Sequence, residues 1–262
     1  MKVHNVISSF NEEGYRRYGR AFVASFLKHW PKNVVLTVYY EGERFDFDEG
    51  MNWHPIDEVE YLKDYMESLR FPIMHGIVGN QYDINFDARM ARKVFMQMHA
   101  MKTYRGKVFW LDADSITHSD VPFGFLDECL PDDKFSCYLG RDGWYYTESG
   151  FIGFNGDHDL ANKFYNNYVH TFITGVHFTL QGWHDCYGYD AVRGIINQPW
   201  EFKNLAEGVP HGTMHPFLNS VLGTYMDHMK GARKDQGHSN EADLVIARDE
   251  DYWKNLGRGK PQ

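Results

Sequence analysis

The sequence predicts an α/β protein with a mixed, mostly parallel central sheet flanked by helices. Two observations support this prediction. Short apolar runs of strand length alternate with longer stretches in which apolar residues recur at helical spacing. The first three segments follow the order strand, helix, strand, which is typical of a parallel βαβ unit. The chain of 262 residues is 43% hydrophobic and 24% charged, so we expect one packed domain spanning residues 1–262.

The N-terminal part of the chain supplies the first βαβ unit. Residues 3–9 and 34–40 are apolar runs of strand length, and they predict the first two strands. Residues 14–30 between them carry apolar side chains at helical spacing, which predicts an amphipathic helix. Pro31 cannot continue that helix and ends it.

The next two segments differ sharply in charge. Residues 41–67 hold ten acidic side chains against two basic ones, so we expect a solvated, irregular surface segment. Residues 85–105 predict a long helix that is basic and has no acidic residue from Ala88 onward. Its basic residues are Arg89, Arg92, Lys93, Lys102 and Arg105.

The remaining elements follow from shorter patterns. Residues 108–111 form a continuous apolar run, as expected of a buried central strand. Further strands are expected at 135–139 and 151–154, and helices at 159–172, 189–196 and 217–228. The polar tail after Lys234 predicts mostly loops.

Composition excludes several classes of protein. The net charge of −9 and the isoelectric point of about 5.8 argue against a general nucleic-acid binder. Cys129, Cys137 and Cys186 are odd in number and lack C-x-x-C spacing, which argues against a disulfide framework and a zinc site. The sequence goes directly into a strand-like run and has no apolar stretch long enough to span a bilayer. We therefore expect a soluble cytoplasmic protein.

The triplet Asp112-Ala113-Asp114 follows the predicted central strand directly. Its two carboxylates lie at the carboxyl end of a buried strand, where open α/β sheets bind their ligands. Side chains alternate along an extended chain, so both carboxylates can face one cation. Mg²⁺ and Mn²⁺ prefer such oxygen ligands and share them with substrate phosphates. The alternative is a turn in which the two aspartates cap the following segment.

The run Phe-Trp-Leu-Asp-Ala-Asp-Ser-Ile-Thr-His-Ser-Asp-Val at 109–121 resembles the Asp-x-Asp region of GT-A-fold glycosyltransferases. The likeness is greatest to the group of glycogenin and the bacterial lipopolysaccharide galactosyltransferases. His228-Met229-Lys230-Gly231-Ala232-Arg233-Lys234 is similar to the His-x-x-Gly-x-x-Lys pattern of the same group. The family's Pro-Trp after this lysine is replaced here by Asp235-Gln236.

This resemblance implies a metal site formed by Asp112, Asp114 and His228, with Mn²⁺ (or Mg²⁺) as the cofactor. An imidazole beside two carboxylates suits Mn²⁺ better than Mg²⁺. Ala113, Gly231 and Lys234 would accompany the metal: a small side chain leaves room for a nucleotide, a glycine lets the backbone approach phosphate, and a lysine supplies a charge for it. Other histidines remain open as the third ligand: His211, His215 and His238.

Three further segments resemble parts of the donor and acceptor pocket. Arg89 or Lys93, four residues apart on the basic helix, would contact the donor phosphates, unless the two form an exposed basic face. Ser9, at the end of the first strand, falls where the family seats the nucleotide base, although Ser9 or Asn11 could instead cap the next helix. Glu148 replaces an amide residue of a pocket-lining strand, and is a candidate nucleophile or hydroxyl-binding group. The alternative is a strand that begins there with a bulge at Gly150.

Residues 182–190 match the interval that holds an Asp-Gln pair beside the reacting sugar carbon in the family. Asp185 is the best match and Asp190 the second, and a carboxylate there would stabilise positive charge on the sugar. Trp183 is a candidate platform for a sugar ring, or else a core residue. His184 is more simply a local hydrogen-bonding residue.

The resemblance thus implies a single GT-A-like (Rossmann-like) domain with a nucleotide-sugar-binding half, residues 1–114, and an acceptor half, residues 115–262. We expect a hexosyltransferase-like enzyme that moves a sugar from a nucleoside diphosphate sugar, UDP-sugar first, to an acceptor hydroxyl with retention of configuration. The acceptor could be a glycan, a protein or a modified nucleic-acid base. The alternatives are a metal-dependent nucleotidyltransferase, which would need a glycine-rich phosphate loop that we do not find, and a non-catalytic nucleotide-sugar-binding module.

Overall fold

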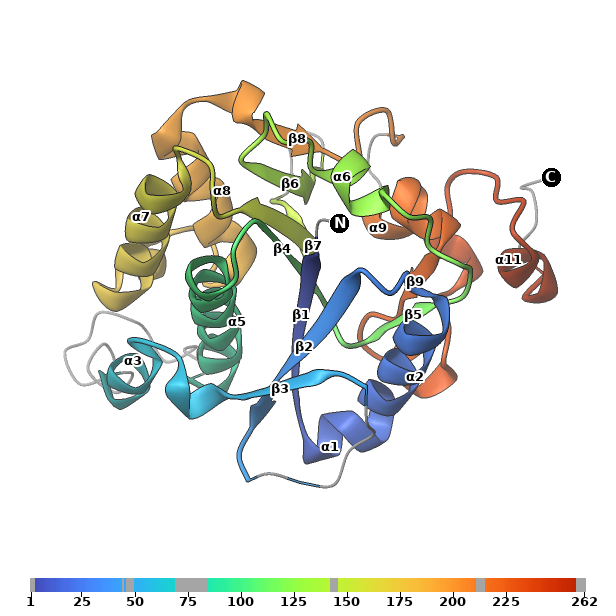
Figure 1. Ribbon diagram of the computed structural model, residues 1–262, viewed down its shortest axis with the longest axis horizontal. Coiled ribbons are helices and arrows are strands. Elements are labelled where there is room, and N and C mark those ends of the chain that lie inside the picture. The colour runs from blue at the N-terminus through green and yellow to red at the C-terminus, as the bar shows by residue number, and fades with distance from the viewer. Residues whose placement is uncertain are drawn as a thin grey trace.

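A computed structural model describes residues 3–43, 45, 50–68, 84–141, 146–210 and 215–257, with only the backbone described for 84–87. Its centre is a seven-stranded sheet in the order β3-β2-β1-β4-β7-β6-β8 (Figure 1). The strands are β1 (His4–Asn11), β2 (Val34–Glu41), β3 (Asn52–Pro55), β4 (Lys107–Leu111), β6 (Ser136–Leu139), β7 (Glu148–Asn155) and β8 (Phe202–Asn204). Among them only β7 runs antiparallel to its neighbours. The prediction of a mixed, mostly parallel sheet is confirmed.

Helices cover both faces of the sheet (Figure 1). One layer contains α3 (Leu62–Ser68), α5 (Ile84–Thr103), α7 (Ala161–Ile173) and α8 (Asp185–Ile196). The other contains α2 (Arg20–His29), α6 (Phe125–Cys129), α9 (Pro216–Asn219) and α11 (Asp251–Asn255). Each layer has its own apolar core.

Strand β4 shows why its sequence is apolar throughout. Val108 and Trp110 belong to the core under α5, whereas Phe109 and Leu111 belong to the core under α2. Side chains alternate between the faces of a strand, so a strand covered on both sides must be apolar at every position. The end of β4 is therefore fixed firmly between the two layers.

The N-terminal helical segment begins at Glu12 and is continuous to His29, as α1 (Glu12–Gly14), a π-helical turn η1 (Tyr15–Gly19) and α2. The side chain of Asn11 caps it by accepting a hydrogen bond from the Gly14 amide at 2.8 Å. The sequence placed this helix correctly but did not indicate the π turn.

The prediction of an irregular surface segment at 41–67 is wrong for its described part after residue 50. That part forms β3, a 3-10 turn η2 (Ile56–Glu58) and α3. Ile56, Val59, Leu62 and Tyr65 are buried in the core despite the acidic residues around them. Four apolar side chains on one face are sufficient to pack this segment against the core, and the acidic side chains occupy the other face.

The predicted helix at 217–228 is also wrong. The chain there forms α9, a 3-10 turn η5 (Val221–Thr224) and a short strand, β9 (Met226–His228). Ser220 is extended, and a side chain at Gly223 would place its Cβ 2.0 Å from the Leu218 carbonyl oxygen. Strand β9 pairs antiparallel with β5 (Ser115–Thr117), so a long-range pairing overrides the helical pattern.

The polar tail contains little regular structure, in line with the prediction: a one-turn helix α10 (Arg233–Gln236), a 3-10 turn η6 (Glu241–Asp243) and α11. Two more 3-10 turns, η3 (Val176–Thr179) and η4 (Pro199–Glu201), complete the described elements. All three cysteines are buried free thiols. None of the described helices combines the length and the apolar character needed to cross a membrane.

Candidate metal centre

The Asp112-Ala113-Asp114 triplet lies at the carboxyl end of β4. The Asp112 amide donates to the Gly150 carbonyl at 2.9 Å, and the Ser115 amide donates to the Asp112 carbonyl at 3.1 Å. The first bond continues the pairing with β7 and the second closes a turn, so the triplet is not the extended segment that the sequence suggested. The turn nevertheless brings both carboxylates to the same imidazole, that of His228.

Two short strands place His228 beside the triplet. In the β5–β9 ladder His228 is opposite Ser115, and the ladder continues with the Met229 amide donating to the Asp114 carbonyl at 2.8 Å. The Nε2 atom of His228 is then 3.1 Å from Asp114 Oδ1 and 3.5 Å from Asp112 Oδ2. Ligand atoms from Asp112, Asp114 and His228 all lie within 4.8 Å of one another.

The buried charges of this cluster hold one another in their ionised forms. Burial by itself raises the pKa of Asp114, but His228 and Lys234 outweigh it and hold this pKa well below the usual carboxyl value. Burial lowers the pKa of His228, but the carboxylates, Asp114 first, more than offset burial and raise it. The Lys234 ammonium is 2.9 Å from Asp114 Oδ2 and also lies over the Tyr18 ring, 4.9 Å from its centre.

Lys93 reaches the same site from α5. Its ammonium is 2.8 Å from Asp112 Oδ1 and 3.3 Å from Asp185 Oδ2, and it donates to the Ser149 carbonyl at 2.7 Å. Burial lowers the pKa of Lys93, but Asp112 and Asp185 raise it by more, so the lysine is a fixed cation. The Trp110 indole donates to the same Asp112 oxygen at 2.5 Å, which orients that carboxylate.

The two aspartates predicted near the sugar carbon have different environments. Asp185 is the first residue of α8, is buried, and faces the pocket through its contact with Lys93. Asp190 accepts from the amide and the hydroxyl of Thr147, both at 2.7 Å, and pairs with Arg193 at 3.0 Å. These contacts hold Asp190 against the start of β7, whereas Asp185 contacts Lys93 in the site; the roles predicted for the two aspartates in the reaction stay predictions.

Glu148 lies on the far side of His228 from the triplet. Its carboxylate is 3.6 Å from His228 Nδ1, pairs with Arg141 at 3.2 Å, and contacts the Lys230 ammonium directly. Burial raises the pKa of Glu148, but Lys230, His228, His215 and Arg141 outweigh burial and lower it strongly.

These groups line one pocket of about 300 Å³. Its described lining residues are Met90, Lys93, Asp112, Asp114, Arg141, Tyr146, Thr147, Glu148, Ser149, His184, Asp185, Cys186, His228, Lys230 and Gly231. With histidines counted as neutral, four acidic side chains face three cationic ones, which leaves one negative charge. A divalent cation would reverse that sign, so the lining suits a metal that then attracts an anion.

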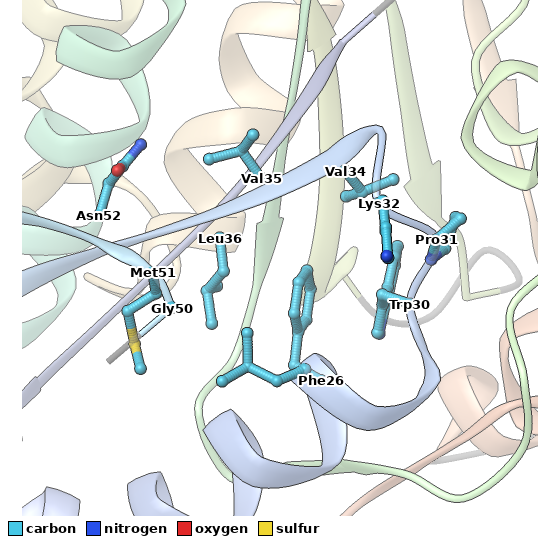
Figure 2. Close-up of a pocket in the computed structure, with 11 residues that line it drawn as sticks. Phe26, Trp30, Pro31, Lys32, Val34, Val35, Leu36, Gly50, Met51 and Asn52 are labelled. Carbon is cyan, nitrogen blue, oxygen red and sulfur yellow. The ribbon is translucent and has the colours of Figure 1, made fainter. Parts of the chain in front are cut away.

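A larger pocket of about 480 Å³ lies between α2, β2 and the start of the edge strand β3, and has different chemistry. Figure 2 shows that its walls come from Phe26, Trp30, Leu36 and Met51, with Lys32 at one side. Lys32 is the one charged side chain among its described lining residues. Size alone does not identify the reactive site, because this pocket offers no set of converging polar groups.

The remaining predicted residues are distributed as follows. Ser9 donates to Glu41 at 3.2 Å, and Asn11, not Ser9, caps the helix. Arg89 is exposed on α5 and is absent from the described lining of the 300 Å³ pocket. Gly231 lines that pocket with φ of +59°, a conformation that favours glycine.

Trp183 contacts Phe178 at 5.9 Å between ring centres and is not among the described lining residues. His211 lies outside the described residues. His238 Nδ1 is 3.0 Å from the Ser239 carbonyl oxygen and is not among the described lining residues, whereas His184 is.

Sequence reasoning missed Lys230, Arg141 and Tyr18, and gave His215 only as an alternative metal ligand. Lys230 is two residues beyond His228, so alternation along an extended chain could have indicated that it faces the same site. Arg141 follows the carboxyl end of β6, which is the edge of the sheet where ligands bind. No local pattern indicated Tyr18, since its position depends on the π turn.

Comparison with known proteins gives only distant likenesses. No protein-family model matches the chain, and no curated protein matches it. It superposes on the apo form of mouse xyloside xylosyltransferase 1 with a TM-score of 0.48 and 12% identity, covering 78% of this chain and 85% of that one. For the glycosyltransferase GlyE of Streptococcus pneumoniae TIGR4, the TM-score is 0.46 and the identity 12%, and the superposition covers 78% of this chain and 45% of GlyE. For the bifunctional glycosyltransferase WbbM, the TM-score is 0.49 and the identity 12%, and the superposition covers 78% of this chain and 39% of WbbM. The chain thus spans less than half the length of GlyE and WbbM.

Proposed function

We propose that this protein is a metal-dependent glycosyltransferase that moves a sugar from a nucleoside diphosphate sugar to an acceptor hydroxyl. The observation that carries the proposal is the convergence of Asp112, Asp114 and His228, from segments more than a hundred residues apart, at the carboxyl end of the sheet. Two carboxylate oxygens and one imidazole nitrogen form a donor set suited to Mn²⁺, with Mg²⁺ as the second choice. When bound there, the ion would supply positive charge for a leaving diphosphate.

The lysines around the pocket support a diphosphate as the ligand. Lys234 and Lys230 are partly exposed, so their ammonium groups can turn from carboxylates towards bound phosphate oxygens. Lys93 is buried and has several partners, so it holds Asp112 and Asp185 in place. Preorganised charges of this kind stabilise a leaving phosphate without reorganisation during the reaction.

Asp185 is the residue that we assign to the sugar. It is the buried carboxylate that lines the pocket outside the metal set and the Glu148 cluster. A carboxylate held there would stabilise the positive charge that develops on the anomeric carbon as the glycosidic bond breaks. Retention of configuration and a UDP-sugar donor are the expectations that follow from the family resemblance, and both belong to this proposal.

The test is a thermal-shift screen of nucleotide sugars with and without Mn²⁺, followed by product analysis. A donor at about a hundredfold excess over its dissociation constant should stabilise the protein by about 2.7 kcal/mol, and only with metal present. Release of UDP or GDP during transfer supports the proposal. Release of pyrophosphate would favour a nucleotidyltransferase, and donor binding without turnover over glycan, protein and modified-base acceptors would favour a binding module.

A matched pair of variants tests the metal site itself. Asp112→Asn and Asp114→Asn keep the side-chain shape and remove one charged ligand each. Unchanged turnover and Mn²⁺ dependence in both variants would rule out the proposed metal centre.

A further inference from the structure

The two ring nitrogens of His228 face different partners. Nε2 faces the aspartates of the triplet, at 3.1 Å from Asp114 and 3.5 Å from Asp112. Nδ1 is buried and makes no hydrogen bond within the described part of the chain, and Glu148 Oε1 lies 3.6 Å from it, just beyond hydrogen-bond distance. An imidazole that binds a metal through one nitrogen carries a hydrogen on the other, and an acceptor for that hydrogen fixes both the tautomer and the ring orientation.

We propose that Glu148 is a positioning residue for His228: its carboxylate accepts the Nδ1 hydrogen and so directs the Nε2 lone pair towards Asp112 and Asp114. This inference rests on the proposed metal-dependent function and assigns Glu148 a role different from the nucleophile or hydroxyl-binding group predicted from the sequence.

Gly150 supports this arrangement by the absence of a side chain. A Cβ atom at this position would lie 2.5 Å from His228 Cε1, 2.7 Å from Nδ1 and 3.0 Å from Glu148 Oε1. The ring edge and the carboxylate therefore meet directly above the glycine backbone. Any other residue would push the two groups apart.

The backbone of His228 is held as firmly as its ring. The carbonyl oxygen of His228 accepts from His215 Nε2 at 2.8 Å and from the Ser239 hydroxyl at 3.0 Å. Ser239 is in turn bound to the buried Asp227, next to His228 in β9. With the main chain fixed, rotation of the ring is the freedom that remains, and Glu148 restricts it.

The surroundings of Glu148 argue against a nucleophile or a second metal ligand. The carboxylate of Glu148 already contacts the Lys230 ammonium and the Arg141 guanidinium. Two cations at this carboxylate reduce its nucleophilicity and would repel a second metal ion between Glu148, His215 and His228. They also keep the carboxylate charged and turned towards Nδ1, which is the state a hydrogen-bond acceptor needs.

The experiment measures Mn²⁺ binding without nucleotide, from the electron paramagnetic resonance signal of free Mn²⁺. Loss of a partner to a metal-bound histidine typically weakens metal binding by about 10- to 100-fold, so Glu148→Ala should weaken it within that range. Glu148→Gln keeps an acceptor oxygen and should give an intermediate loss. Gly150→Ala should weaken Mn²⁺ binding as well, although it leaves every charge in place.

The control is Asp127→Asn, which alters a second carboxylate–histidine pair, Asp127 with His4 at 3.0 Å, remote from the metal set. It should leave Mn²⁺ affinity within about twofold of the wild type. Unfolding midpoints in urea without metal separate loss of fold from loss of positioning. Should the Glu148 variants not fold, nitrogen-15 spectra of labelled histidines in the Mg²⁺-bound wild type decide the matter, with the Nδ1–H tautomer expected for His228.

The outcomes separate this inference from the proposed function. A wild-type protein that binds no Mn²⁺ would overturn the metal centre. If folded Glu148→Ala and Gly150→Ala bound Mn²⁺ as tightly as the wild type, the role of Glu148 alone would be overturned. The opposite tautomer of His228 in the wild type would have the same consequence.

Discussion

The two ends of strand β4 carry the same kinds of residue and have different properties. At the amino end Lys107 pairs with Asp127 at 2.6 Å and with Asp132 at 2.7 Å, and His4 adds a third contact to Asp127. At the carboxyl end the triplet carboxylates meet a lysine and a histidine in a similar set of contacts. Both ends could be described as a carboxylate–histidine–lysine cluster.

Burial and shape distinguish them. The side chains of Asp127 and Asp132 are 41% and 68% exposed, so water already solvates their charges. Those of Asp114 and Asp185 are 11% and 4% exposed, and they line a pocket. Charges held away from water in a concave site interact strongly with a ligand, whereas charges in water do not. The comparison teaches that convergence under burial identifies the site, and residue type alone does not.

The largest expected difference between the two ends concerns stability. Lys93→Met leaves Asp112 and Asp185 without their buried cation, and should lower the free energy of unfolding by about 3–5 kcal/mol. Lys107→Met leaves carboxylates that water can solvate, and should cost no more than about 1 kcal/mol. Urea denaturation without metal measures both, and equal losses would contradict the comparison.

The second difference concerns function. Asp114→Asn should reduce sugar transfer by at least about 100-fold. The change removes one ligand of the proposed metal ion, whose charge would stabilise the leaving diphosphate. Asp127→Asn, the same change at the other end of β4, should keep transfer within about twofold of the wild type. Initial rates at saturating donor give the ratio, and a similar loss in both variants would point to a structural effect.

The third difference is a dependence on pH. The raised pKa of His228 means that its imidazole keeps its second proton to a higher pH than an ordinary histidine, and a metal ion must displace the proton on Nε2. Mn²⁺ affinity should therefore increase as pH rises through this pKa, by up to about tenfold per pH unit below it. Binding titrations between about pH 6 and pH 8 measure the slope. A flat profile would exclude His228 as a ligand.

The smallest effect is expected at an exposed ion pair on the carboxyl-end side of the sheet. Arg17 in the π turn makes two 2.8 Å hydrogen bonds to Asp235 in α10, the helix that carries Lys234. Both side chains are largely exposed, so Arg17→Ala should change stability by less than about 1 kcal/mol. A larger loss of stability in thermal unfolding would show that nearness to the site, more than burial, determines how much this ion pair contributes to stability.

The sequence was sufficient to predict the sheet, most of its helices, and the three residues Asp112, Asp114 and His228 that the fold brings together. Strand β4 and the triplet were recognisable because a fully buried strand is apolar at every position, and both aspartates follow it directly. His228 was found by its spacing to Gly231 and Lys234, a local pattern that does not depend on how the intervening chain folds.

The errors come from contacts between distant residues. The helical spacing at 217–228 extends over residues 226–228, but these pair with β5 as a strand, and no local signal reports a partner more than a hundred residues away. The contacts of Lys230 and Arg141 with their common partner Glu148 also join distant segments, although the positions of both residues next to the site could have been predicted from the sequence. Asp190, the second match in the interval 182–190, lies about one and a half helical turns beyond Asp185 on α8 and contacts Thr147 and Arg193, and its role in the reaction stays a prediction.

The pairing of β5 with β9 has a consequence for how the chain folds. Residues 115–117 and 226–228 must find each other across more than a hundred residues, and such non-local pairings are formed late and at high entropic cost. The proposed metal site does not exist until that pairing is complete, so Mn²⁺ would recognise only the finished fold. Amide hydrogens of this small ribbon should then exchange with solvent more slowly once the ion is bound, which would make metal uptake a direct signal that the last segment of the protein has folded.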